Sequence, residues 1–481
     1  MHWKLILSAA FHALFGTVPY SHNTILNPME SSIRHFINQS MYERYQLLLS
    51  PDQAAWFWSA TTASLPIGAT LGSLIVGILA ERIGRRAVCM VVCNSVFICG
   101  CLLQFSARSA NSLELLMLGR MMAGMSQSLS CLTPIYLMEC ATDRCKSMVG
   151  MGIAVGFPLW NALGTVIGML QLMGGEDTWS EALLMPAFLA FVHLVTFPLF
   201  PDSPKYLYIT KGNINKTVQA IKFYRGTEVN VKQIEEAYWS EISKVSSHHC
   251  ASISWRHILT IRRLRIPFLL CMIANLSNRM GGIDIGIQYS TGTLSSLGVP
   301  KTDSALCTVV FMQVPSIFMA ILGMVVSKKL SRRTHFLSLL VLGLLAVFSL
   351  FLSNLPFMGS AGPICALSGL MLSLSSFYIG SSCIAKMLPA EVCPQAIRAT
   401  VVAAQNFVSN VTSIFIVLLY PPLHQAIGPW ALVPLVLAGV ASLVWLCKNM
   451  PETQNRSVME VMESWIECEE FSEKEPLLRK W

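Results

Sequence analysis

The sequence contains few charged residues. Only 12% of its 481 residues are Asp, Glu, Lys or Arg, and 53% are hydrophobic, whereas about 25% of the residues of an ordinary soluble domain are charged. So few polar side chains cannot cover the roughly three soluble domains that this length would allow. The mean hydropathy of +0.55 is typical of a chain that crosses a membrane several times.

Acidic residues are scarcer than basic ones. There are 26 Asp and Glu against 34 Lys and Arg, which gives a net charge of +8. A basic chain can bind nucleic acid, but these charges lie between apolar runs. The preference of Lys and Arg for the cytoplasmic side of a membrane explains them better. We therefore expect the lipid bilayer as a partner and no nucleic acid.

The sequence also lacks the motifs of enzymes and cofactor sites. Its fifteen cysteines are scattered through apolar segments, and none has the C-x-x-C spacing of a zinc or redox site. There is no H-E-x-x-H, no nucleophile elbow, and no Gly-rich phosphate loop followed by Lys. We expect no enzyme activity, no cofactor and no metal.

Twelve apolar runs are long enough to cross a bilayer, which takes about 20 helical residues. The expected fold class is therefore an all-α membrane protein with twelve transmembrane helices. The first run follows Lys4 and could be a signal peptide, but it continues past any cleavage site to Asn23, which favours an anchor. The predicted spans are residues 5–27, 56–80, 87–106, 113–138, 147–172, 182–200, 266–290, 304–327, 334–355, 361–388, 399–422 and 429–450.

The distribution of Lys and Arg sets the orientation. The connection 201–265 alone holds eleven of them, whereas the connections on the other side of the membrane hold four in all. This asymmetry predicts that both termini are cytoplasmic. Asn38, in Asn38-Gln39-Ser40, then lies outside the cell as a candidate glycan acceptor.

Polar signatures at the span ends recur about 250 residues apart, which indicates two similar halves. Parallel repeats of this kind place a solute site between the halves near the midplane of the membrane. The recurring pairs are Glu81–Arg86 with Lys328–Arg333, Glu139 with Glu391, and Pro201–Pro204 with Pro451–Thr453. The expected domains are two six-helix bundles (1–200 and 266–450), a cytoplasmic linker with short helices (201–265) and a cytoplasmic tail (451–481).

Six short motifs occur in a fixed order along the chain. They are Asn23–Pro28, Gly77–Arg86, Gly119-Arg120 with Gly124, Pro134–Glu139, Pro201–Leu207 and Pro451–Ser457. In this order and spacing they resemble the sugar porter branch of the major facilitator superfamily, and within it the animal facilitative glucose transporters (solute carrier family 2). The resemblance covers nearly the whole chain and implies a plasma-membrane transporter.

The resemblance also implies a gating network at the cytoplasmic end. Glu139 and Glu391 are expected to face arginines where the two bundles meet, in ion pairs that form in one state and break in the other. Lys328 and Ser331 replace an acid and a glycine of the motif, which predicts a weaker network in the second half. The expected members are Glu81, Arg85, Arg86, Arg120, Glu139, Arg332, Arg333, Glu391 and Arg398.

Most of the family's hexose ligands are replaced in this chain. Ala154 stands at the position of the span-five glutamine, Lys386 stands at that of the span-ten tryptophan, and only the amides of span eleven remain. The expected solute-binding residues are Asn278, Arg279, Asp284, Ser316, Lys386, Asn406 and Asn410.

Three of these residues are charged, and each costs at least about 2.5 kcal/mol inside a span unless it is paired or faces water. In one interpretation Asp284 neutralises a neighbouring base. Residues 279 and 284 lie about 140° apart on a continuous helix, so they pair only if Gly281-Gly282 breaks it. In the other interpretation the cavity keeps one net positive charge and prefers an anionic solute. Both remain open.

The predicted function is facilitative transport of a small polar solute, by default a hexose such as glucose or fructose, by alternating access. The alternatives are transport of an organic anion or other non-hexose solute through Arg279 and Lys386, and a non-transporting solute sensor. Uniport is favoured because the first span contains no carboxylate, although His12 and His22 could titrate. In the tail, Glu473 with Leu477-Leu478 matches a sorting signal, which predicts adaptor binding and an endosomal pool.

Overall fold

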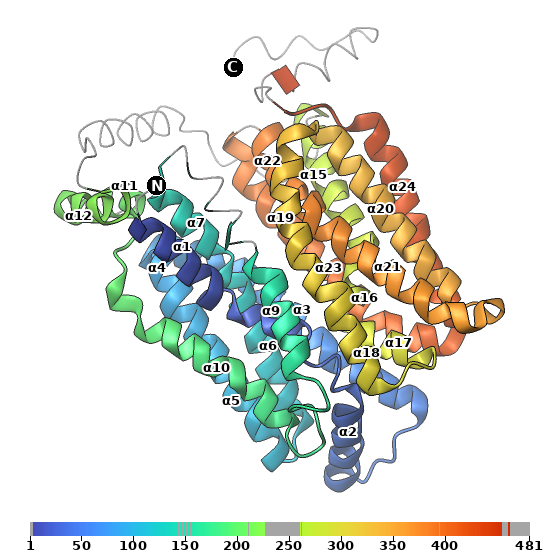
Figure 1. Ribbon diagram of the computed structural model, residues 1–481. Coiled ribbons are helices and arrows are strands. Elements are labelled where there is room, and N and C mark those ends of the chain that lie inside the picture. Colours follow the sequence, from blue (N-terminus) through green and yellow to red (C-terminus); the bar gives the residue numbers. More distant parts are fainter. Residues whose placement is uncertain are drawn as a thin grey trace.

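The computed structural model forms two groups of helices that lie side by side (Figure 1). It describes residues 3–142, 145, 149, 152–153, 155–209, 211–226, 260, 262–393, 395–454 and 460–461. The start of α1, at Trp3, and the described residues 460–461 lie at one end of the molecule, which we call the terminal face. Helix α2 (Glu30–Tyr45) lies at the opposite end, which we call the α2 face.

Close packing around glycines characterises the first group. Gly68 lies against the backbone of Met121, and Gly100 lies against Gly119, at positions where a Cβ would collide. Small residues of this kind allow helices to pack closely in a bilayer. The elements are α1 (Trp3–Phe15), η1 (Val18–Asn23), α3 (Pro51–Ile83), α4 (Arg85–Ala87), η2 (Val88–Val92), α5 (Cys93–Ser109), α6 (Leu113–Ser130), α7 (Leu132–Cys140), α9 (Gly156–Ile167), α10 (Trp179–Val195) and η3 (Phe197–Leu199).

The second group contains several interrupted helices. Gly282, with φ +76°, separates α15 from α16, and the π-helical segment η6 interrupts the span that ends in α22. The elements are α15 (Arg262–Met280), α16 (Ile283–Gln288), α17 (Ser290–Ser296), α18 (Lys301–Thr308), η4 (Val309–Gln313), α19 (Val314–Lys329), α20 (Arg332–Ser353), η5 (Pro356–Ala361), α21 (Gly362–Ser376), η6 (Phe377–Ser381), α22 (Ser382–Val392), α23 (Gln395–Ile427), η7 (Gly428–Leu432) and α24 (Val433–Asn449).

Two short helices begin the connection between the groups. They are α11 (Pro204–Ile209) and α12 (Ile214–Arg225), in agreement with the short helices expected in this linker. Gly226, with φ +95°, ends α12, and its N–H donates to the Lys222 carbonyl. The rest of the predicted helical stretch, up to Val245, lies outside the described residues.

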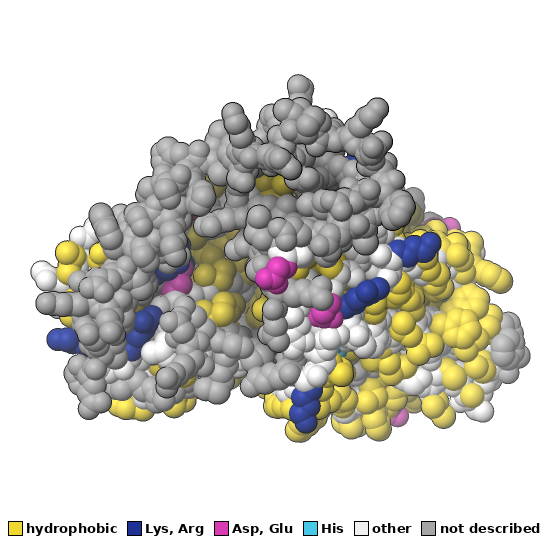
Figure 2. Space-filling model, turned by 90° about the horizontal axis from the view of Figure 1, so that it is seen from above, with side chains coloured by type: hydrophobic (Ala, Val, Ile, Leu, Met, Phe, Trp, Pro, Cys, Tyr) yellow, Lys and Arg dark blue, Asp and Glu magenta, His cyan; other side chains and the backbone are white. Residues whose placement is uncertain are grey.

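The surface agrees with a protein that crosses a membrane. Seven stretches of the described residues are long and apolar enough to span a bilayer. The other predicted spans, such as 266–290, correspond to helices that are broken or only partly described. Figure 2, which looks onto the terminal face, shows hydrophobic side chains over one flank and basic and acidic side chains on the face itself.

Candidate functional site

A partly buried ion pair forms at the break between α15 and α16. Because Gly282 interrupts the helix, the Arg279 guanidinium reaches the Asp284 carboxylate, with Nη1 and Oδ1 2.8 Å apart. This is the arrangement that the sequence allowed only if the helix were broken at Gly281-Gly282. Arg279 is therefore neutralised by its own span.

Two serines of α23 complete this pair, and the sequence analysis missed both. Arg279 Nε donates to Ser409 Oγ (2.9 Å), and Ser413 Oγ donates to Asp284 Oδ1 (2.7 Å). The two serines are four residues apart, so they lie on one face of the helix. That spacing was the available signal, but serines in apolar helices are too common for it to stand out.

Lys386 is the exception among the predicted charged residues. Its side chain is exposed although it lies in α22, six residues before that helix ends. In the part of the chain that the structure describes it has no ion pair or hydrogen bond, and it lies near the like charge of Arg279 and near Cys131 of the first group. Lys386 therefore supplies an uncompensated positive charge between the two groups.

The other predicted binding residues divide into occupied and free side chains. Asn278 Oδ1 accepts a hydrogen bond from Ser381 (2.6 Å), and the Ser316 hydroxyl donates to the Met312 carbonyl within its own helix (2.6 Å). The half-buried amides of Asn406 and Asn410 have no hydrogen-bond partner among the described residues. The amides of Asn406 and Asn410 can therefore bind a solute, whereas the Ser316 hydroxyl can only accept a hydrogen bond from one.

A chain of amides crosses from the first group to the second, and the sequence analysis did not identify it. Gln127 Nε2 donates to Asn23 Oδ1 (2.9 Å), Asn23 Nδ2 donates to Asn161 Oδ1 (3.3 Å), and Asn161 Nδ2 donates to the Tyr378 hydroxyl (2.6 Å). Ala154, the aligned position in span five, lies outside the described residues. Asn161, two helical turns further along, brings an amide to the interface instead.

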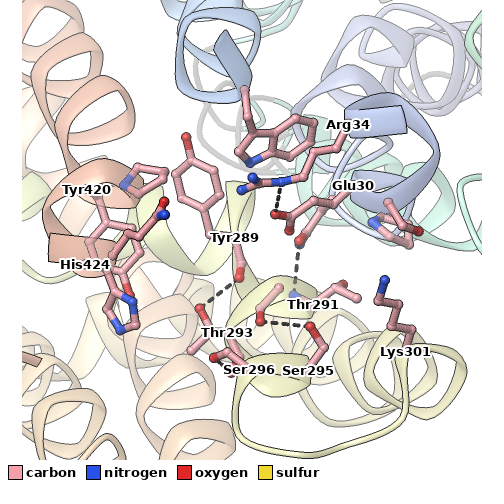
Figure 3. A pocket seen from close by; sticks show the side chains of 17 residues that line it. Glu30, Arg34, Tyr289, Thr291, Thr293, Ser295, Ser296, Lys301, Tyr420 and His424 are labelled. Carbon is pink, nitrogen blue, oxygen red and sulfur yellow. Dashed lines mark hydrogen bonds and ion pairs between the residues drawn. The ribbon is translucent and has the colours of Figure 1, made fainter. Parts of the chain in front are cut away.

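Hydrogen bonds join the two groups toward the α2 face. Asn27 Nδ2 donates to Ser290 Oγ (2.6 Å), and Asn27 Oδ1 accepts the N–H of Thr291 (3.0 Å), at the start of α17. The Tyr289 hydroxyl donates to the Val417 carbonyl (2.7 Å) and lies 2.6 Å from the Thr62 hydroxyl. These bonds hold the two groups of helices together on this side; Tyr289 and Thr291 are labelled in Figure 3.

At the terminal face, by contrast, each predicted glutamate pairs within its own half. Arg85 Nε lies 3.5 Å from Glu139 Oε1, and Ser203 donates to the same carboxylate. Arg332 Nε lies 3.6 Å from Glu391 Oε1, and Thr453 donates to that carboxylate (2.5 Å). The repeat seen in the sequence therefore appears in space as two matching networks.

The remaining members of the expected gating network are more scattered. Arg86 donates to the Phe200 carbonyl, and Arg333 Nη2 donates to the Cys447 carbonyl (2.6 Å). Glu81 is exposed and forms no ion pair with another described residue. The side chain of Arg398 lies outside the described part of the chain.

Arg120 does not belong to this network, which corrects the expectation from sequence. It lies in the middle of α6, fully buried, and its Nε donates to the Thr61 carbonyl (3.0 Å). Nineteen residues separate it from Glu139, about 28 Å along a helix. The arginine of the G-R motif therefore lies too deep in its bundle to reach the terminal-face glutamates.

Two predicted surface features lie outside the transport path. Asn38 is exposed on α2, and the hydroxyl of Ser40, two residues on, is buried and donates to the Asn111 carbonyl (2.7 Å). Glu473, Leu477 and Leu478, the expected sorting signal, lie outside the described residues.

Comparisons with known proteins place this geometry in a family. The Sugar (and other) transporter family matches residues 8–465. Human solute carrier family 2, facilitated glucose transporter member 7, is 26% identical over 469 residues, which cover 95% of this chain and 88% of that protein. Human member 9 of the same family is 23% identical over 474 residues, which cover 96% of this chain and 85% of that protein.

The fold is similar to that of solved transporters. The inward-open structure of the xylose transporter XylE from E. coli superposes with a TM-score of 0.76 at 15% identity, covering 96% of this chain and all of that one. The two-bundle, all-helical arrangement is thus that of the major facilitator fold, and the matched family extends over nearly the whole chain. The chain therefore belongs to the Sugar (and other) transporter family.

Proposed function

We propose that this protein is a facilitative transporter of a small polar solute, by default a hexose, and that it works by alternating access. One observation carries the proposal: hydrogen bonds between the halves gather toward the α2 face, whereas the glutamate networks of the terminal face stay within each half. A transporter closed on one side has this asymmetry. Residues 1–200 and 266–450 act as the two moving bundles, joined by 201–265.

The positive-inside rule gives the orientation of this state. Both termini, the linker and the tail 451–481 are cytoplasmic, so the protein is closed to the outside and faces inward. We assign it to the plasma membrane, with Asn38 glycosylated before α2 packs against the Asn111 carbonyl. The sorting signal at Glu473 and Leu477-Leu478 recruits adaptors and maintains an endosomal pool.

A hexose is supported by the named relatives and by the amides between the bundles. Asn161, Asn406 and Asn410 can exchange hydrogen bonds with sugar hydroxyls, and together they replace the lost family ligands. The first span has no carboxylate to carry a proton, so transport is uniport. Counterflow of labelled glucose into proteoliposomes tests this. We expect exchange that a pH gradient does not change, and the absence of exchange from folded protein would reject a hexose.

One observation favours a second solute class. The unpaired Lys386 gives the cavity one net positive charge, which suits an organic anion. Lys386→Glu should then reduce anion exchange at least tenfold and leave glucose exchange less affected, because a like charge would replace the attractive one. Lys448→Glu, at an exposed end of α24, is the matched control. If neither variant changes solute preference, Lys386 plays no part in selectivity.

A further inference from the structure

A cavity lies beyond the closed gate, toward the α2 face. It has a volume of about 420 Å³ and is lined by both bundles, with Asn27, Glu30, Arg34 and Trp58 from the first. The second contributes α17, Lys301 and the end of α23, so Tyr289 and Thr291 stand at the boundary between gate and cavity (Figure 3). Small-molecule sites in proteins typically have volumes of about 300–1,000 Å³.

The charges in this cavity do not balance. Arg34 Nε lies 2.7 Å from Glu30 Oε1, so the charges of these two residues neutralise each other. The Arg34 guanidinium also lies over the Trp58 ring. Lys301 has no partner within the described ranges, and its side chain points toward α2 (Figure 3). The cavity therefore has one uncompensated positive charge.

Two buried polar atoms of the lining also lack a partner. Trp58 is fully buried, and its indole Nε1–H donates to no described group; Thr291 is 5% exposed, and its Oγ1 is equally unbonded. A buried polar atom without a hydrogen bond is uncommon and requires an explanation. Here both belong to a polar cavity, where a ligand could satisfy them.

Three further hydroxyls of the lining have oxygen lone pairs available. Thr293 donates to the carbonyl of Tyr289, which precedes α17, Ser295 donates to that of Gly292, and Ser296 donates to that of Thr293. Their protons are thus engaged, and their oxygens can accept hydrogen bonds from ligand hydroxyls. The lining therefore combines one cation, one indole donor and several acceptors.

We propose that this cavity is an effector site for a small polyhydroxylated carboxylate, a sugar acid. Its carboxylate would pair with Lys301, and its other oxygens would reach the Trp58 N–H and the α17 hydroxyls. Because both bundles line the cavity, a ligand there stabilises the state closed at the α2 face. An external sugar acid would then slow transport. This effect requires the proposed alternating access, but binding itself does not depend on the identity of the transported solute.

Binding of D-glucuronate to the full-length protein in lipid nanodiscs, measured by calorimetry with D-glucose as the neutral comparator, tests this. We expect glucuronate to bind at least tenfold more tightly than glucose at this site, because a charge-assisted hydrogen bond is worth about that factor. Lys301→Ala should remove most of the difference, Lys301→Arg should keep it, and Trp58→Phe should weaken binding a few-fold.

The controls separate this site from the central one. Lys448→Glu, at an exposed end of α24, should leave glucuronate binding unchanged. If Lys386→Glu abolishes binding and Lys301→Ala does not, the anion binds centrally and the proposal is wrong. Equal affinity for glucose and glucuronate would also overturn it. Glucose counterflow in proteoliposomes of the same purified protein is an independent measurement. Intact counterflow without a preference for glucuronate rejects the effector site alone, and glucuronate preference without counterflow rejects only the transported hexose.

Discussion

The two halves hold their terminal-face glutamates with the same partners but build the adjacent turn differently. Glu139 and Glu391 each receive an arginine at about the same distance and a hydroxyl from the segment that leaves the bundle. Beside the first network, Gly84 has φ +95°. At the equivalent place in the second half, Ser331 has φ −61° and caps α20.

This difference shows that a repeated network does not require a repeated turn. A Cβ on Gly84 would lie 2.7 Å from Tyr206 Cε1 and 2.9 Å from Asp202 Oδ2, so only glycine fits. In the second half the Ser331 hydroxyl accepts the N–H of Thr334, and Glu452 accepts the N–H groups of Arg332 and Arg333. Helix capping there replaces the glycine turn.

Exchanging the two turn residues should give the largest difference in stability between the two halves. Gly84→Ser combines a disallowed φ, which costs about 1–3 kcal/mol, with a clash against Tyr206. We expect its apparent thermal midpoint in detergent to fall by about 5 °C or more. Ser331→Gly loses only a cap, worth a few tenths of a kcal/mol. If both variants lowered the thermal midpoint by the same amount, the two turns would contribute equally to stability.

Removing the glutamate charges tests whether the networks are as equal as their distances suggest. Glu139→Gln and Glu391→Gln each remove a partly buried ion pair, and a loss of about 1 kcal/mol is expected for each. The sequence predicted a weaker network in the second half, because Lys328 and Ser331 replace the motif's acid and glycine. The nearly equal distances, 3.5 and 3.6 Å, predict similar losses instead.

Thermal unfolding of the two variants side by side decides between these expectations. Arg333→Ala serves as a control, because its guanidinium donates to the Cys447 carbonyl rather than to Glu391. If Glu139→Gln lowers the midpoint and Glu391→Gln does not, the sequence argument holds and the geometric one fails.

The terminal-face networks were predictable because their residues lie in short motifs at helix ends. A repeat of about 250 residues matched Arg85 and Glu139 with Arg332 and Glu391 and put all four in one expected network, without any knowledge of helix rotation. The apolar runs were equally direct evidence of helices. What the motifs could not show was that each glutamate pairs within its own half in this state.

The interior of the path was less predictable, because it depends on how each helix is rotated and how deep each residue lies. Arg120 belongs to a recognisable motif, but its depth in α6 separates it from the glutamates. Asn161 lies two turns from the position that alignment indicates, and it joins Asn23 and Tyr378 only after three helices have packed. Gly282 was the exception, since glycine pairs often mark helix breaks.

The smallest expected difference between the halves is in how stability depends on pH. It arises from the two carboxylates next to the networks, Asp202 and Glu452. Burial raises the pKa of Asp202 above 3.8, and hydrogen bonds and nearby arginines offset this only partly. Burial also acts to raise the pKa of Glu452, but hydrogen bonds from Gln454, the Ser331 hydroxyl and the backbone of α20 outweigh it and lower that pKa below 4.5. The two carboxyls should therefore respond oppositely to acid.

Folding favours the protonated form of Asp202, so its contribution to stability is largest below pH 3.8 and is lost as pH rises through its folded pKa. Folding favours ionised Glu452, whose contribution is present above pH 4.5 and is lost as pH falls through its folded pKa. At pH 7, Asp202→Asn should therefore maintain or raise the thermal midpoint, whereas Glu452→Gln should lower it. At pH 4 both differences should shrink. A lower midpoint for Asp202→Asn at pH 7 would show that the hydrogen bonds to Asp202 outweigh the cost of its burial, and the two halves would then be alike in this respect as well.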